Sequence, residues 1–394
     1  MSERKMRLRY GLFVSSTATV RRKELCALRA VYGDLSEALE GEKGYRVRQV
    51  RDWIYERGIT NFDEMTNLPL ALRQKLARDV PEFALELLEE RVSVDGTVKR
   101  AYRGGSSSAF VIESVLMRYD DGRNTACLSS QAGCAMGCVF CATGQMGFQK
   151  QLSALEIFEQ ACRFDAELKK QDTDSRGGGL NRVVMMGMGE PLLNFDAVSE
   201  AIDRIQSDLG IGARRITVST VGVVPNILKF GERHPQCNLA ISLHAANDQE
   251  RSKLLPANQR YGGLDVLMET ARDYWRMTNR QVTFEWALPH HDDVNDVTRK
   301  ATELGLLLGR YGLYGPASHV NVIPLNPTKG FKGVAPASEA NVRAFVDTLA
   351  SHEISATIRL RRGIDIDAGC GQLATDLLHL VDDAGTPQQQ LESS

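Results

Sequence analysis

Hydrophobic and polar positions divide the chain into an N-terminal helical part and a longer part in which strands and helices alternate. Residues 45–57 predict a basic amphipathic helix, because their apolar positions fall on one helical face and arginines occupy the remainder. The apolar positions are Val47, Val50, Trp53 and Ile54, and the arginines are Arg46, Arg48, Arg51 and Arg57. Asn67-Leu68-Pro69 predicts a break before a second helix near 72–78. Residues 92–117 alternate as strands do, around a Gly104-Gly105 turn.

From residue 125 onward, short apolar stretches alternate with helical patterns. The expected strands are 182–188, 215–220, 238–243, 282–288, 319–324 and 356–360. Ser153 and Glu156 form a capping box that starts one helix, and Val342, Phe345, Val346 and Leu349 mark the buried face of another. Repeated strand–helix units predict a parallel sheet covered by helices, more typical of a partial α/β barrel than of an open sheet. The chemistry is then expected at the carboxyl ends of the strands.

Composition and charge set limits on the class of protein. The 394 residues suffice for one large domain and a smaller one. From the patterns above we expect a helical domain at 1–95, a domain of alternating strands and helices at 96–380 and a disordered tail at 381–394. No apolar run approaches the ~20 residues of a membrane span, and the N-terminus lacks a signal-peptide core, so we expect a cytoplasmic protein without a membrane partner. Residues 1–60 hold 13 Lys and Arg against 8 Asp and Glu, an excess that could contact phosphates or form an ordinary solvated face.

The most informative motif is Cys-x3-Cys-x2-Cys, formed by Cys134, Cys138 and Cys141 in a glycine-rich loop. Three thiolates can hold three irons of a [4Fe–4S] cluster and leave the fourth iron open for S-adenosylmethionine. Structural zinc is the alternative, with Cys127 as a fourth ligand. A disulfide framework is disfavoured, because the chain has only 8 cysteines and no secretory signal.

Two further motifs add to this chemistry. In Gly189-Glu190-Pro191, which follows an apolar strand, the glycine lets a ligand approach the backbone and the carboxylate could bind an ammonium group. Cys370 is flanked by small residues downstream of Arg359, where its sulfur could be reached by a bulky reactant.

Together these motifs resemble the RlmN- and Cfr-type radical SAM RNA adenine methyltransferases over nearly the whole chain. The resemblance rests on Cys127-Leu-Ser-Ser-Gln-Ala-Gly-Cys134, the cysteine triad, Met186-Gly-Met-Gly-Glu-Pro-Leu-Leu-Asn194, Ala240-Ile-Ser-Leu-His-Ala245 and Asp365-Ile-Asp-Ala-Gly-Cys-Gly-Gln-Leu373. It implies a radical-SAM partial (β/α)6 barrel with a small N-terminal helical domain that binds RNA.

The resemblance also implies a role for each motif residue. Cys134, Cys138 and Cys141 would ligate the [4Fe–4S] cluster. S-adenosylmethionine would be bound by Gly189, Glu190, Ser219, Ser242, Leu243, His244 and Asn326. Cys370 would carry the methyl group, Cys127 would release the product through a transient disulfide, and Glu113 would accept a proton.

The implied reaction methylates C2 of an adenosine in 23S rRNA, and of tRNA as well, in a monomer that receives electrons from a donor such as flavodoxin or ferredoxin. The alternatives are adenine-C8 methylation of the Cfr type, methylation of a small aromatic molecule, and an RNA-binding protein without catalysis. The motifs barely separate C2 from C8, because both reactions use the same two cysteines.

The sequence departs from the family pattern mainly on the substrate side. Where the family usually has Arg-Lys-Thr-Arg-Gly-Asp-Asp, this chain has Arg-Leu-Arg-Arg-Gly-Ile-Asp, with Leu360, Arg361 and Ile364 as the changes. The segment 290–293, His-His-Asp-Asp, is also unusual, and one extra residue separates Glu113 from Cys127. These changes leave the radical chemistry intact and put the choice of substrate in question.

Overall fold

The structure is a computed structural model that describes residues 39, 41–57, 62–79, 85–104, 109–171, 178–288, 293–326, 328, 330–331 and 337–374. The chain forms two compact units. One comprises residues 1–83 together with 165–178, and the other comprises 84–164 together with 179–394. The expected tail at 381–394 and His290–Asp292 lie outside the described residues.

The smaller unit contains the two expected helices. The first is α3 (Gly44–Arg51), which continues as the π-helical turn η3 (Asp52–Glu56), and the second is α4 (Leu70–Asp79), after the 3-10 turn η4 (Phe62–Glu64). Val50 and Ile54 are buried as the periodicity predicts, while Arg48 and Arg57 are exposed. Burial of one apolar stripe thus leaves basic side chains on the outside.

The larger unit is built around a ten-stranded sheet in the order β1-β2-β3-β4-β7-β8-β9-β10-β11-β12. An antiparallel part consists of β1 (Leu85–Val92), β2 (Val98–Gly104) and β3 (Phe110–Arg118), which pairs antiparallel with β4 (Asn124–Cys127). From β4 on, all neighbours are parallel: β7 (Arg182–Met185), β8 (Ile216–Thr220), β9 (Asn238–Ser242), β10 (Val282–Leu288), β11 (Ser318–Pro324) and β12 (Ser355–Ile358). A separate hairpin pairs β5 (Gln131–Gly133) with β6 (Phe148–Gln151).

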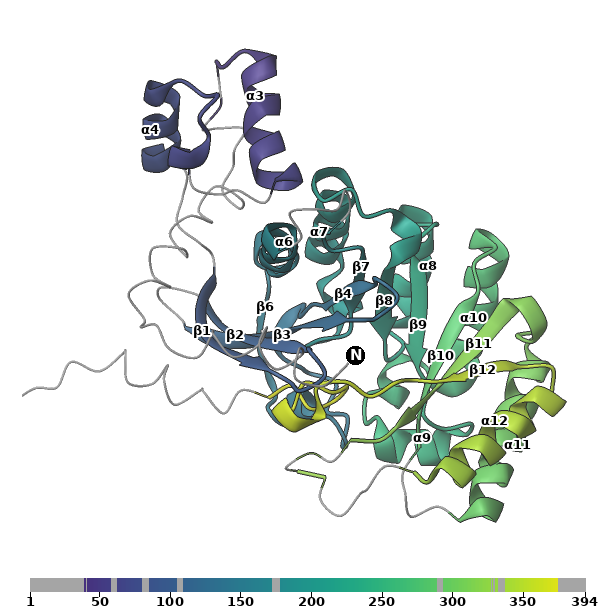
Figure 1. Cartoon of the computed structure of the whole chain (residues 1–394). Coiled ribbons are helices and arrows are strands. Elements are labelled where there is room, and N and C mark those ends of the chain that lie inside the picture. The colour runs from purple at the N-terminus through teal and green to yellow at the C-terminus, as the bar shows by residue number, and fades with distance from the viewer. Residues whose placement is uncertain are drawn as a thin grey trace, which may run out of the picture. The chain divides into compact units, whose positions relative to one another are not determined.

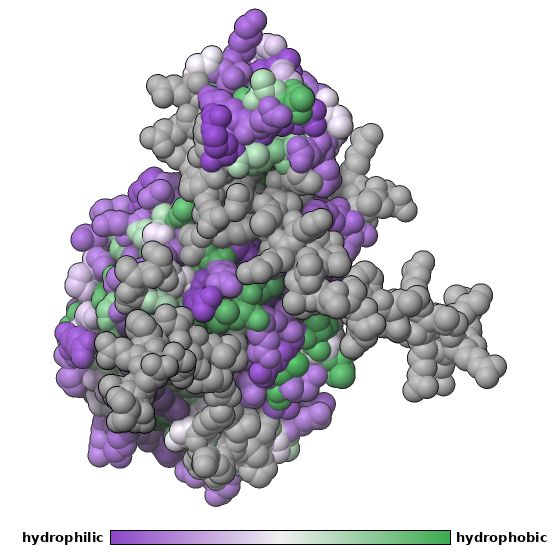
Figure 2. Space-filling view, turned by 90° about the vertical axis from the view of Figure 1, so that its left-hand side faces the viewer, coloured by the Kyte–Doolittle hydropathy of each residue, from purple (hydrophilic) through white to green (hydrophobic). Residues whose placement is uncertain are grey.

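Helices connect the parallel strands, as right-handed strand–helix–strand crossovers require. They are α6 (Ala154–Gln171), α7 (Phe195–Asp208), α8 (Val224–Arg233), α9 (Asp248–Leu254), α10 (Gly263–Thr278), α11 (Val294–Arg310) and α12 (Glu339–Ser351), and the short α5 (Ala142–Gln145) follows the cysteine loop. Figure 1 shows most of them along one side of the sheet, while the segment after β12, in yellow, crosses toward β1–β3. In Figure 2 the described residues are mostly hydrophilic on the face shown, with hydrophobic residues in smaller groups.

Local sequence explains the element boundaries. The capping box at α6 forms as expected, since Ser153 N donates to Glu156 Oε2 (2.7 Å) and Glu156 N donates to Ser153 Oγ (3.2 Å). In α7 the buried positions Val198, Ala201, Ile202 and Ile205 have helical spacing. The expected parallel sheet with helices between its strands is confirmed, and it does not close, as expected of a partial barrel, because its edge strands are β1 and β12.

Two expectations about boundaries need correction. The strand expected at 182–188 ends at Met185, because the following glycine-rich residues turn away to form the site. Strand β1 lies before the domain boundary expected at residue 95 and pairs with β2, so the sheet begins earlier than the helical patterns suggested. Among the described residues, no helix combines the length and the apolar composition that a membrane crossing requires.

Candidate active site

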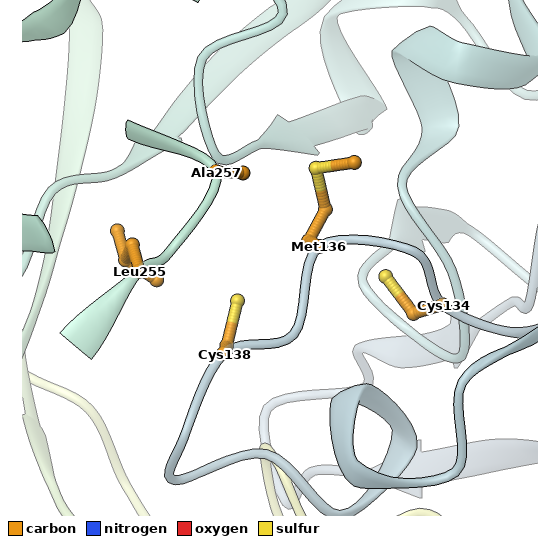
Figure 3. Packing of buried hydrophobic residues seen from close by; sticks show 5 residues of the cluster. All are labelled: Cys134, Met136, Cys138, Leu255 and Ala257. Carbon is orange, nitrogen blue, oxygen red and sulfur yellow. The ribbon is translucent and has the colours of Figure 1, made fainter. Parts of the chain in front are cut away.

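The three motif cysteines lie on the loop between β5 and α5. Cys134 and Cys138 are buried and Cys141 is partly buried. Backbone hydrogen bonds fix the loop at Cys134 N to Gly147 O (2.8 Å) and at Cys141 N to Cys138 O (3.1 Å). Figure 3 shows Cys134 and Cys138 on either side of Met136, facing Leu255 and Ala257. Packing thus holds the loop against the segment that follows α9.

The thiols of this loop need a positive partner to ionise. Burial raises the pKa of Cys134 to about 12 and also raises the pKa values of Cys138 and Cys141. Iron binding would supply that partner and release the protons. All three cysteines line one cavity, here called the cofactor chamber, together with Gly189, Glu190, Ser219, Ser242, His244 and Glu285. A thiol set that opens onto a polar cavity fits a three-cysteine [4Fe–4S] cluster with one accessible iron.

The zinc alternative is not supported by this arrangement. Cys127, the expected fourth ligand, does not line the cofactor chamber. In the described part of the chain, no group of three His, Cys, Asp or Glu side chains is placed to hold a single metal ion.

Glu190 lines the cofactor chamber and is 2% exposed. Its carboxylate accepts hydrogen bonds from Leu192 N (3.0 Å) and Val221 N (2.8 Å), while burial raises its pKa to about 7. The preceding Gly189 has φ 101°, and a Cβ there would lie 2.5 Å from the side chain of Gln131, so the turn requires glycine. Glu190 therefore joins the turn after β7 to the end of β8, in addition to lining the cavity.

His244 enters the chamber as a neutral ring. Its Nδ1 accepts a hydrogen bond from Ala287 N (2.9 Å), so the proton resides on Nε2. Burial lowers its pKa to about 3, and its ring packs edge-on against Phe140 of the cysteine loop at 4.9 Å. The residue adopts φ 61°, an uncommon conformation for histidine. Sequence spacing alone did not single it out.

Two of the expected S-adenosylmethionine residues lie elsewhere. Leu243 has a fully buried side chain outside the lining, and its carbonyl accepts from Arg251 Nε (3.2 Å). Asn326 lines the adjacent cavity instead, where its Nδ2 donates to the carbonyl of Cys370 (3.3 Å). Gly189, Glu190, Ser219, Ser242 and His244 are the ones that the structure brings together.

The adjacent cavity, here called the cysteine chamber, contains both cysteines of the proposed methyl transfer. Cys127 ends β4 and Cys370 lies near the C-terminus, yet both line this chamber. Cys370 also lines the cofactor chamber, so this residue borders both cavities. Burial, and after it the charge of Cys370, raise the pKa of Cys127 to about 12. All seven described cysteines are free thiols, so the expected disulfide is not supported by this structure.

Arg359 stands between the chambers and was not identified by sequence reasoning. Its guanidinium lies 3.4 Å from the carboxylate of Glu285 and donates to the sulfur of Met186. The thiolate of Cys370 and then Glu285 raise its pKa above the ordinary arginine value. The only signal in the sequence was the basic run before Cys370.

The segment 363–374, here called the Cys370 segment, is anchored at both ends. Before Cys370, the Asp365 carboxylate accepts from Ser93 Oγ (2.5 Å) and Asp95 accepts from Gly363 N (3.0 Å). After it, Ala142 N donates to the carbonyl of residue 371 (2.8 Å) and Thr143 Oγ1 donates to that of residue 373 (2.6 Å). Cys370 is thereby held beside the loop that ends at Cys141.

Glu113 lies on β3 and lines neither chamber. Burial raises its pKa to about 7, against the opposing effects of Lys99 (3.3 Å) and the backbone amide of Ala374. Its Oε2 atom is buried without a hydrogen-bond partner. A carboxyl group with this pKa could exchange a proton near neutral pH.

Comparison with known proteins identifies the family. Residues 36–80 match the ribosomal RNA large subunit methyltransferase N-terminal domain, and residues 128–310 match the radical SAM superfamily. A probable dual-specificity RNA methyltransferase RlmN of Moorella thermoacetica is 44% identical over 340 residues, covering 84% of this chain and 92% of that protein. This chain belongs to the RlmN family.

Other relatives support the same family assignment. The dual-specificity RNA methyltransferase RlmN 1 of Myxococcus xanthus is 44% identical, with 84% of this chain and 88% of that protein covered. A crystal structure of a radical SAM methyltransferase from Sphaerobacter thermophilus has a TM-score of 0.76 and 41% identity, and covers 86% of this chain and 96% of that one. As an RlmN-family enzyme, the chain is a radical SAM methyltransferase whose cofactors are a [4Fe–4S] cluster and S-adenosylmethionine.

Proposed function

We propose that this enzyme converts an adenosine of 23S ribosomal RNA to 2-methyladenosine, and that it also acts on transfer RNA. The observation that carries the proposal is the position of Cys370, which lines both the cofactor chamber and the chamber of Cys127. A thiol in this position can receive a group from one cavity and present it in the other. The names of the relatives, dual-specificity RNA methyltransferases, support RNA as the substrate.

Within this proposal, the residues of the chain divide the work. When bound, the cluster and S-adenosylmethionine supply a methyl group and one-electron chemistry. Cys134, Cys138 and Cys141 hold the cluster, while Gly189, Glu190, Ser219, Ser242 and His244 hold S-adenosylmethionine. Leu243 and Asn326 support the walls, Leu243 through its carbonyl bond to Arg251 and Asn326 through its bond to the Cys370 segment.

Cys370 carries the methyl-derived carbon to the adenine ring. The sulfur of Cys127 then attacks the sulfur of Cys370 and breaks its bond to the RNA-linked carbon. The electron pair of that bond passes to the carbon side, which takes up a proton to give the methyl group, and the two cysteines are left as a transient disulfide. Glu113 accepts a proton, a role that its pKa of about 7 and its unpaired oxygen support. A buried thiol with the pKa of Cys127 ionises poorly, and Arg359 favours its thiolate form.

The domain roles follow the same proposal. The N-terminal domain binds RNA through its basic face, and the exposed Arg48 and Arg57 support this role. The whole protein is a cytoplasmic monomer, and its catalytic domain receives electrons from a donor such as flavodoxin or ferredoxin.

The deciding experiment is nucleoside mass spectrometry of 23S rRNA and tRNA from cells with and without the gene. We expect 2-methyladenosine only in the presence of the gene. Finding 8-methyladenosine instead would establish the Cfr-type reaction. If the RNA is unmodified but the reconstituted enzyme cleaves S-adenosylmethionine, the remaining hypothesis is methylation of a small aromatic molecule. Failure to cleave S-adenosylmethionine would contradict catalysis altogether.

A further inference from the structure

The cysteine chamber carries more positive charge than the proposed methyl transfer uses, because only Arg359 has a role in that reaction. Its lining contains Arg359, Arg361 and Arg362 and no aspartate or glutamate. The cofactor chamber, in contrast, contains the carboxylates of Glu190 and Glu285. A cavity with several arginines and no acidic side chain favours an anionic ligand.

The three arginines differ in the contacts that their side chains make within the protein. Arg359 pairs with Glu285. Arg362 donates to the carbonyl of Asp95 (3.2 Å), and its guanidinium lies 4.6 Å from the ring centre of Tyr119. Arg361 is exposed, and within the described part of the chain it makes no hydrogen bond, ion pair or ring contact. Its guanidinium is therefore available to a ligand.

We propose that Arg361 binds a phosphate of the RNA strand next to the adenosine that enters the cysteine chamber, an inference that rests on the proposed function. An enzyme that modifies a base must bring it out of the stack into its pocket, and the sugar–phosphate backbone follows to the mouth of that pocket. Arginine matches phosphate with two parallel hydrogen bonds. A small uncharged aromatic substrate would bring no such group.

This contact belongs to this chain rather than to the usual family pattern. Where that pattern has lysine and threonine, the chain has Leu360 and Arg361. Leu360 is 64% exposed and cannot bind a phosphate. At these two positions of this chain the positive charge is therefore carried by Arg361.

The test compares the reconstituted holoenzyme with its Arg361→Gln variant on a 23S rRNA fragment that the wild type methylates. The KM for RNA is measured at several salt concentrations, and the Arg361→Lys and Arg343→Gln variants serve as controls. Arg343 lies on α12, is exposed, and likewise has no partner among the described residues. Cluster content and methylation of Cys370, read by mass spectrometry, show whether each variant keeps its fold and its cofactor reactions.

We expect Arg361→Gln to raise the KM about tenfold at low salt, with a much smaller change in kcat. It should also reduce the slope of log KM against log salt by about 0.7 to 1, the contribution of one phosphate contact. Arg361→Lys should retain most of the slope, and Arg343→Gln all of it. An unchanged slope in Arg361→Gln, or an equal loss in Arg343→Gln, overturns this inference alone. A wild type that methylates no RNA overturns the proposed function as well.

Discussion

The hydroxyl of Ser93 donates a 2.5 Å hydrogen bond to the carboxylate of Asp365, and so joins two residues 272 positions apart. The amide of Val94 donates to the same carboxylate (3.2 Å). Both donors belong to the turn between β1 and β2, at the edge of the sheet far from the cysteine loop in sequence. This turn therefore fixes the start of the Cys370 segment, whose other end is fixed at α5.

We expect Asp365→Ala to slow the reaction without unfolding the enzyme, because Asp365 is exposed but anchors the reactive segment. Misplacing Cys370 by about 1 Å would reduce kcat by about tenfold to a hundredfold. Hydrogen exchange should rise in 363–371 while the sheet strands keep their protection. Asp367→Asn is the matched control in the same segment, because asparagine tolerates its φ of 53°. Wild-type exchange in 363–371 of Asp365→Ala would contradict the anchoring role.

The position of Cys127 in the cysteine chamber leads to a second prediction. Without its thiol, the bond between the Cys370 sulfur and RNA cannot be broken, so Cys127→Ala should accumulate protein covalently attached to RNA. Denaturing gels with labelled RNA under turnover conditions measure the adduct. Cys237→Ala, which removes a buried thiol that lines neither chamber, should accumulate none. Absence of an adduct in Cys127→Ala would rule out its resolving role.

Much of this arrangement could be predicted from local sequence, and the missing parts share one physical cause. Strands β8 to β12 lie within two residues of the predicted ranges, because alternating apolar residues reveal strands. The cysteine loop was recognisable by its spacing. The roles of Glu285 and Arg359 were not, because their contact joins a side chain of β10 to one just after β12 and depends on tertiary packing. The hydrogen bond between Ser93 and Asp365 could not be predicted either, because a contact between distant positions produces no periodic pattern in the sequence.

The contact of Arg359 with Glu285 gives a third prediction, on stability. Glu285 is 3% exposed, so Arg359→Gln leaves a buried carboxylate without its cation. We expect the free energy of unfolding to fall by about 2 kcal/mol, less than for a fully buried pair because the arginine is partly exposed. The double variant Arg359→Gln with Glu285→Gln should recover part of this loss. Urea unfolding of the wild type, the two single variants and the double variant measures the coupling energy between the two side chains. Additive losses of unfolding free energy would show that the pair has no coupling energy.

Glu113 gives a prediction on pH dependence, because burial raises its pKa to about 7. A carboxyl group accepts a proton only when ionised, so kcat should rise with pH through about 7 and level off near 8. Glu113→Gln should lose this pH dependence, together with about a hundredfold or more of the activity.

Lys99→Met provides the sharper test. Lys99 favours the charged carboxylate, so its removal should raise the pKa of Glu113 and shift the rise in kcat to higher pH. A rise that does not move in Lys99→Met would assign it to another group, such as Glu190, whose pKa is also about 7.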